Sequence, residues 1–161
     1  MDVRKPNRLV KYDYSSPGYY FVTVCVEGRM SCLAECIDEE IHINSFGKIV
    51  EQVWQDTENH YDNIAVDPVH VVMPNHFHGI VIIRPRRADA IRPYGTLESV
   101  VGSFKRKTSK LIHLSDFPTF SWQKSFYDHV IREDESLDTI RQYIQNNPKQ
   151  WELDEENPNK K

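Results

Sequence analysis

The sequence of 161 residues has little cysteine and no apolar segment long enough to cross a membrane. Its three cysteines, Cys25, Cys32 and Cys36, are odd in number, and no second cysteine pair follows them. This pattern argues against a disulfide framework and a zinc site, and favours packed thiols in a reducing compartment. The first residues also lack the pattern of a signal peptide. We therefore expect a cytoplasmic protein that has no membrane partner.

The sequence as a whole also lacks an excess of positive charge, and its formal net charge is −4. A nucleic-acid-binding function must therefore depend on local charge. From Arg84 to Lys110, eight basic residues stand against two acidic ones, Asp89 and Glu98. Candidates for DNA-phosphate contacts lie in this segment and near the N-terminus: Arg4, Arg8, Arg86, Arg87, Lys105, Arg106, Lys107 and Lys110. The alternatives are a solvated helix face and a frayed terminus.

Length and composition predict a single domain over residues 1–161. Hydrophobic residues make up 39% of the chain and aromatic residues 11%, which is enough for a buried core. We expect a basic N-terminal arm over about residues 1–11 and a loose acidic tail over about 152–161.

Hydrophobic periodicity predicts an alternation of strands and helices. The expected strands cover residues 19–26, 32–35, 40–43, 64–72 (with a break at Asp67-Pro68), 76–83 and 126–131. The expected helices cover residues 45–61, the segment between Gly95-Thr96 and the break at 115–118, and about 133–146. The turn before residue 76 is too short for a crossover, so the two strands around it should form an antiparallel hairpin. This order predicts an α+β fold, a ferredoxin-like antiparallel sheet with helices packed mainly on one face.

Two histidines, His76 and His78, flank Phe77 in an apolar, β-branched run. Side chains alternate along a strand, so both imidazoles point to one face and Phe77 to the other. The preceding Pro74-Asn75 is a turn signal, which places the pair at the start of a strand near the rim of the sheet. Two imidazoles on one face form half of a divalent metal site. The alternatives are a neutral core pair and ordinary hydrogen-bonded imidazoles.

The last predicted helix can supply the other half of such a site. Leu137, Ile140 and Ile144 recur at helical spacing and should face the sheet. Tyr143 borders this stripe, and Asn147 lies one turn further along the same face. A hydroxyl group and an amide oxygen are thus presented together at the end of a helix. The alternatives are a boundary aromatic side chain and a C-terminal helix cap.

Other side chains are weaker candidates. Tyr127 is a rival nucleophile, but it lies on a strand and has no metal ligand one turn away. His129 shares the face of Tyr127 and could approach a metal, although a structural role is more typical. His60, His70 and His113 are isolated in the sequence.

The histidine and tyrosine motifs resemble those of a known family. Val72-Met73-Pro74-Asn75-His76-Phe77-His78-Gly79 and Tyr143-Ile144-Gln145-Asn146-Asn147-Pro148 are similar to the motifs of single-tyrosine HUH transposases of the insertion-sequence 200/605 type. The closer resemblance is to their REP-associated tyrosine transposase branch, because mobile relatives usually carry Gln at the position of Asn147. The resemblance runs from about Arg8 to Trp151.

The resemblance implies a metal-dependent endonuclease and strand transferase acting on single-stranded or hairpin DNA. His76, His78 and Asn147 would hold Mg2+ or Mn2+, and Tyr143 would attack the DNA to form a 5′-phosphotyrosine. Relatives act as monomers or homodimers, so the sequence leaves both states open. The alternatives are a hairpin-DNA-binding protein with a vestigial site and a metal-free phosphoesterase. The latter would require two His-x-Thr/Ser motifs, whereas this chain has one His-x-His.

Overall fold

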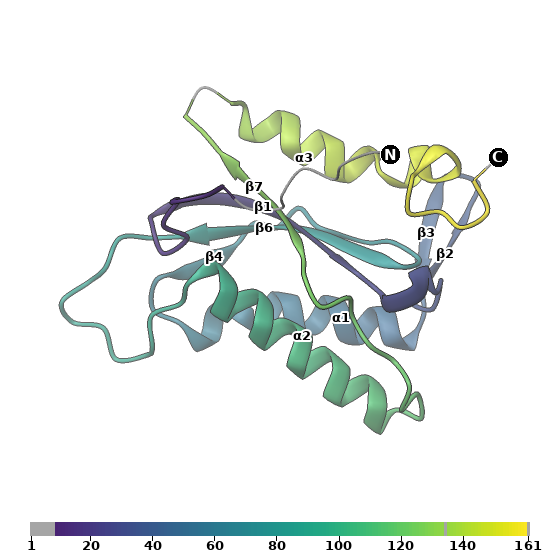
Figure 1. Cartoon of the computed structure of the whole chain (residues 1–161), viewed down its shortest axis with the longest axis horizontal. Helices are drawn as coiled ribbons and strands as arrows, with labels where there is room; N and C mark the ends of the chain where they lie inside the picture. Colours follow the sequence, from purple (N-terminus) through teal and green to yellow (C-terminus); the bar gives the residue numbers. More distant parts are fainter. Residues whose placement is uncertain (1–8, 134, 161) are drawn as a thin grey trace.

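A five-stranded antiparallel sheet forms the centre of the protein (Figure 1). The computed structural model describes residues 9–133 and 135–160. The strands of the sheet are β1 (Gly18–Cys25), β4 (Ile64–Val66), β5 (Val71–Val72), β6 (His76–Ile83) and β7 (Tyr127–Ile131). They lie in the order β4-β6-β1-β7, and β5 also pairs with β6.

Three α-helices, a small hairpin and three short 3-10 helices complete the described fold. The helices are α1 (Ser45–Asp56), α2 (Leu97–Leu114) and α3 (Leu137–Asn146). The hairpin consists of β2 (Ala34–Ile37) and β3 (Glu40–Ile43), and the 3-10 helices are η1 (Glu27–Arg29), η2 (Thr57–His60) and η3 (Pro148–Leu153). Asn44 caps α1 by accepting from two backbone amides, and Thr96 and Ser99 form a capping box at the start of α2.

The chain order β1-α1-β4-β6-α2-β7, with β1 and β6 in the middle of the sheet, is the split β-α-β arrangement. It confirms the predicted α+β, ferredoxin-like fold. Helices α1 and α2 cover one face of the sheet, while α3 lies on the other face (Figure 1). Two of the three helices therefore follow the expected packing on one face.

The observed bounds differ from the predicted ones at the ends of elements. The helix expected over residues 45–61 ends at Asp56 and continues as η2, where Asn59 and His60 both bond to the Asp56 carboxylate. The last helix begins at Leu137 and not near residue 133, because Ser136 accepts a hydrogen bond from Thr139 N and caps it there. The bonds to Asp56 accompany a tighter helical turn, and the bond to Ser136 starts a helix. Neither changes the spacing of apolar residues from which the helices were predicted.

Alternation along β6 divides its side chains between two apolar clusters. Phe77 packs against Trp54 of α1 and Phe104 of α2 in the larger core. Ile80 lies on the opposite face, in a smaller cluster with Ile144 of α3. The strand therefore presents its even-numbered side chains to α3, and the two histidines begin that row.

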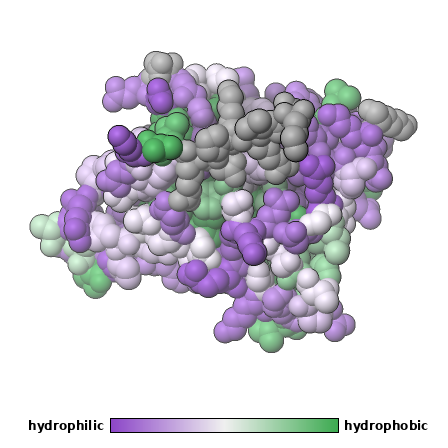
Figure 2. All heavy atoms as spheres, in the orientation of Figure 1, coloured by the Kyte–Doolittle hydropathy of each residue, from purple (hydrophilic) through white to green (hydrophobic). Residues whose placement is uncertain are grey.

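The surface seen in Figure 2 is mostly hydrophilic, with its hydrophobic residues in small separate groups. In the described ranges, the chain has no helix that is both long and apolar enough to span a bilayer.

Candidate active site

A cavity of about 410 Å³ lies where the start of β6 meets the end of α3. Its lining includes His76 and His78 from β6, Tyr143 from α3, and Asn147 directly after α3. The structure therefore brings together the four residues that the sequence analysis singled out for chemistry.

The two imidazoles face each other inside this cavity. Their Nε2 atoms are 3.1 Å apart, and their ring centroids are 4.6 Å apart. Both side chains are buried: His76 is 1% exposed and His78 is 5% exposed. One cation can contact both nitrogens at this separation, since metal–imidazole bonds are about 2.1 Å long.

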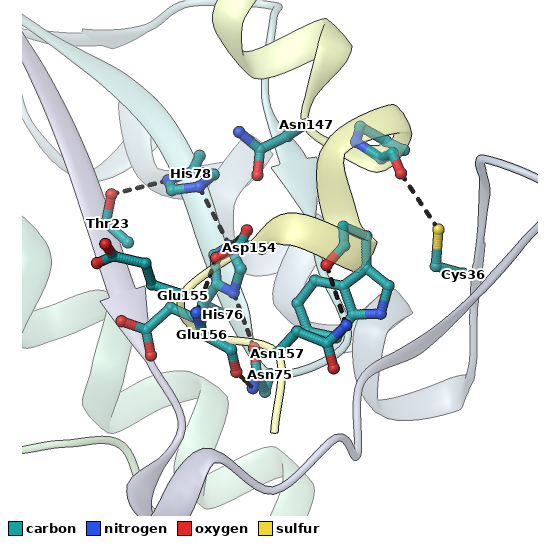
Figure 3. Close-up of polar contacts among 12 residues, drawn as sticks. Thr23, Cys36, Asn75, His76, His78, Asn147, Asp154, Glu155, Glu156 and Asn157 are labelled. Carbon is teal, nitrogen blue, oxygen red and sulfur yellow. Dashed lines mark hydrogen bonds and ion pairs between the residues drawn. The ribbon is translucent and has the colours of Figure 1, made fainter. Parts of the chain in front are cut away.

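Hydrogen bonds on the far side of each ring fix its orientation (Figure 3). Asn75 Oδ1 accepts from His76 Nδ1 at 2.8 Å. Thr23 Oγ1 lies 2.7 Å from His78 Nδ1, and the strand register places Thr23 of β1 directly beside His78. Such contacts to the outer nitrogen orient the Nε2 atom toward a metal.

Burial keeps both rings in the neutral form. It lowers the pKa of His78 well below its ordinary value, and the neighbouring His76 lowers it further, while Asn147 opposes the decrease. Burial also lowers the pKa of His76, against the opposing effects of Asp154 and Asn147. Neutral imidazole is the form that binds a cation.

The side chain of Asn147 offers an oxygen donor in the same cavity. Asn147 is 3% exposed, and its Oδ1 has no hydrogen-bond partner among the residues that the structure describes. Its Nδ2 lies 3.4 Å from the Tyr143 carbonyl, which leaves Oδ1 as the free acceptor. An unpaired buried amide oxygen is costly unless a ligand satisfies it.

These residues fit a divalent cation such as Mg2+ or Mn2+, because two imidazoles and an amide oxygen suit Mn2+ and hard cations favour oxygen donors. Within residues 9–133 and 135–160, no cluster of three or more His, Cys, Asp and Glu side chains is arranged for a metal ion. The buried, unpaired amide oxygen of Asn147 is therefore the candidate for a third donor beside the two imidazoles.

Tyr143 stands at the mouth of the cavity. Its side chain is 50% exposed, and its ring centroid lies 5.9 Å from that of His78 and 5.9 Å from that of Phe21. The ring packs edge-on against both neighbours. Tyr143 is therefore accessible to a large substrate and close to the imidazoles.

The acidic tail, for which the sequence indicated little order, lies beside the imidazoles (Figure 3). Asp154, Glu155 and Glu156 line the cavity, and an Asp154 carboxylate oxygen lies 3.8 Å from His76 Nε2. The Asn75 side chain donates to the Glu156 carbonyl at 2.6 Å. These carboxylates favour a cation in the cavity, and a phosphate group beside them would need such a cation to offset their charge.

Of the weaker candidates, Tyr127 lies at the cavity, whereas His129 and His70 make contacts elsewhere. Tyr127 of β7 also lines the cavity, since the strand register places it next to Thr23 of β1. His129 instead lies 2.7 Å from the Glu135 carboxylate, outside the cavity. His70 bonds to Glu51, which is a structural contact. Among the described residues, Tyr127 is thus the one other tyrosine that lines the cavity with Tyr143.

The basic residues do not gather at the cavity. Lys105, Arg106, Lys107 and Lys110 belong to α2, on the face of the sheet opposite α3. The Lys105 ammonium donates to the carbonyls of Gln123 and Lys124 at 2.6 and 3.1 Å. Arg106 and Lys110 border a shallow hollow beside Trp122.

The loop before α2 carries the two other described candidates. Arg86 lies over the Tyr94 ring, 4.5 Å from its centroid, and Arg87 pairs with Asp89. Arg4 and Arg8 lie outside the described residues.

Comparison with known proteins gives a family match and a structural match. Residues 15–147 match the family described as "Transposase IS200 like". An uncharacterised protein of Haemophilus influenzae is 31% identical over 173 residues, covering 94% of this chain and 92% of that protein. The structure of a REP-associated tyrosine transposase bound to a REP hairpin matches with a TM-score of 0.55 and 18% identity, over 85% of this chain and 67% of that one. At this identity the structural match shows a shared fold.

Proposed function

Because the chain belongs to the IS200-like transposase family, we propose that it cleaves and rejoins single-stranded DNA at hairpins through a covalent phosphotyrosine. The observation that carries this proposal is the convergence of Tyr143, His76, His78 and Asn147 on one cavity. All four come from one chain, so the proposed reaction does not require a second copy, although a dimer is compatible with it. Because its proposed substrate is cellular DNA, the protein is proposed to act in the cytoplasm.

In the proposed reaction, Tyr143 is the nucleophile. Its phenolic oxygen forms a bond to phosphorus while the bond from phosphorus to the 3′ oxygen breaks. The phenolic proton leaves to solvent, and the 3′ oxygen takes up a proton. The products are a 5′-phosphotyrosine and a free 3′-hydroxyl, which can later attack the phosphotyrosine and restore a DNA strand.

His76, His78 and Asn147 are the proposed ligands of Mg2+ or Mn2+. When bound, the cation polarises the scissile phosphate and neutralises charge that develops on it in the transition state. Asn75 and Thr23 keep the imidazoles oriented, and the half-exposed Tyr143 leaves room for a DNA strand at the mouth of the cavity.

Hairpin DNA is the proposed substrate because the chain shares its fold with a transposase whose structure contains a REP hairpin. Asn147 followed by Pro148 supports the same REP-associated branch. The proposed contacts with DNA phosphates are made by basic residues of the arm, the loop before α2 and α2 itself: Arg4, Arg8, Arg86, Arg87, Lys105, Arg106, Lys107 and Lys110.

The test uses hairpin-bearing single-stranded DNA labelled at its 3′ end, incubated with protein and Mn2+ or Mg2+. Attachment through a 5′-phosphate leaves the 3′ label on the protein, so a labelled adduct should persist on a denaturing gel. Tyr143→Phe should abolish the adduct without weakening hairpin binding, and Tyr127→Phe should retain it.

Two outcomes would contradict the proposal. An adduct that persists in Tyr143→Phe would overturn the assignment of the nucleophile. Tight hairpin binding by the wild-type protein without cleavage under either metal would instead support the non-catalytic DNA-binding alternative.

A further inference from the structure

An ion pair joins the tyrosine-bearing helix to the edge of the sheet. Arg141 of α3 donates to the carboxylate of Asp67, in the connection between β4 and β5, with Nε at 3.1 and 3.2 Å from its two oxygens and Nη2 at 2.6 Å from one of them. Asp67 is 1% exposed. A charge-assisted, multiply bonded contact of this kind is directional as well as strong.

The Asp67 carboxylate is itself held in place. The backbone N–H of Asp67 donates to the Ile80 carbonyl of β6 at 3.0 Å. One carboxylate oxygen also accepts from the Val69 N–H at 2.9 Å. The acceptor that Arg141 meets is therefore part of the edge of the sheet.

The apolar contact between α3 and the sheet is small, and Leu137 and Ile140 contribute to it as partly buried side chains. Ile144 is the one buried residue of this helix, and it packs with Ile80 and Ile131 in a cluster much smaller than the main core. A narrow apolar contact permits rotation of a helix about its axis more readily than a wide one does. A further directional contact is needed to fix that rotation.

Arg141 and Tyr143 lie on the same helix, so a contact that fixes the direction of Arg141 also fixes the direction of Tyr143. At 100° per residue, they lie about 160° apart around the helix, on the two borders of the apolar stripe. Arg141 reaches the sheet edge on one border, and Tyr143 lines the cavity on the other.

We propose that Asp67 and Arg141 are positioning residues that set the rotation of α3 and thereby aim Tyr143 into the cavity. This inference rests on the proposed role of Tyr143 as the nucleophile. The proposal assigns a function to Asp67 and Arg141, which are not part of the lining of the cavity.

The test compares variants that keep the charge or the shape of the pair. Arg141→Lys keeps the positive charge but loses the planar guanidinium that bonds both carboxylate oxygens. Asp67→Asn keeps the shape but removes the charge, and it serves as the second variant where Arg141→Lys folds poorly. Asp138→Asn is the matched control, because Asp138 pairs with the same Arg141 from an exposed position on α3.

Four readouts together separate positioning from stability and from catalysis. A fluorotyrosine placed at position 143 reports its ring environment by 19F NMR without DNA or metal, since that ring packs on Phe21 and His78. Single-turnover adduct formation, hairpin affinity and thermal unfolding are measured on the same variants. We expect Arg141→Lys to shift or broaden the 19F signal and to slow adduct formation by roughly tenfold to a hundredfold. Hairpin affinity should remain unchanged, and Asp138→Asn should match the wild type throughout.

The outcomes for the two proposals are distinct. A wild-type 19F signal and a wild-type rate in folded Arg141→Lys and Asp67→Asn would overturn the positioning role. A wild-type protein that forms no adduct would overturn the proposed function, while the 19F comparison would still decide whether the pair orients Tyr143.

Discussion

The side chains of His76 and Asn75 are joined by a hydrogen bond of 2.8 Å between Nδ1 and Oδ1. Asn75 also donates from Nδ2 to the carbonyls of Arg29 and Glu156, at 3.2 and 2.6 Å. These two donor contacts fix which end of the amide faces the imidazole. The Nδ1 of His76 is therefore protonated, and its Nε2 presents a lone pair to the cavity.

Asn75→Ala should weaken binding of Mn2+ by about tenfold to a hundredfold, because the His76 ring loses the contact that selects its tautomer. Isothermal titration of the DNA-free protein with Mn2+ measures this change. Asn59→Ala is the matched control, since Asn59 makes one exposed contact to Asp56. An unchanged Mn2+ affinity in folded Asn75→Ala would show that Asn75 does not support the site.

The local patterns of the sequence predicted much of this site. Alternation along one strand placed His76 and His78 together and sent Phe77 into the core, as observed. Helical spacing placed Tyr143 and Asn147 on one side of α3, and both line the cavity. These predictions succeed because each depends on the geometry of a single element, which the sequence period specifies.

The contacts that support the site could not be read in the same way. Thr23 and His78 are 55 residues apart, and Asp67 and Arg141 are 74 residues apart. Such pairs depend on strand register and on which sheet face a helix covers, and no local period encodes either. The apolar stripe of α3 would have the same sequence pattern whichever face of the sheet the helix covered.

Binding to hairpin DNA should depend on salt through the basic side chains of α2. Arg106→Gln and Lys110→Gln should each weaken hairpin affinity and reduce the slope of log K against log salt by about 0.7–0.9, because each would remove one of the proposed phosphate contacts. Fluorescence anisotropy between low and moderate salt measures both quantities. Lys48→Gln, an exposed change on α1, is the control and should leave the slope unchanged.

Lys105→Gln should behave differently from its neighbours on α2. Its ammonium is engaged by the Gln123 and Lys124 carbonyls, so its loss should lower the free energy of unfolding by about 1–3 kcal/mol. Urea unfolding followed by tryptophan fluorescence measures this change. A fully stable Lys105→Gln with a reduced salt slope would contradict this structural contact and leave Lys105 with only its proposed contact to a DNA phosphate.

The thiol of Cys32 should react slowly in the folded protein. Burial raises its pKa to about 11, so at pH 8 the thiolate is about a hundredfold scarcer than for an ordinary thiol. Iodoacetamide labelling, with each cysteine quantified by peptide mass spectrometry, should show Cys32 reacting faster in urea than in buffer. The native rate should rise about tenfold per pH unit between pH 8 and 10. Equal rates in buffer and urea would contradict the partly buried environment of this thiol.

Two glycine-to-alanine changes should alter stability in opposite directions. A methyl group at Gly79 would lie 2.5 Å from a Trp54 ring carbon and 2.9 Å from a Phe77 ring carbon, both in the packed core. Gly79→Ala should therefore lower the free energy of unfolding by about 1–3 kcal/mol.

At Gly102, in the middle of α2, the nearest atom is the end of the flexible Arg106 side chain at 3.2 Å. Gly102→Ala should raise stability by about 0.5–1 kcal/mol, since alanine favours the helix. Urea unfolding measures both variants. If Gly79→Ala were as stable as the wild type, the close packing of Trp54 and Phe77 against Gly79 would be wrong.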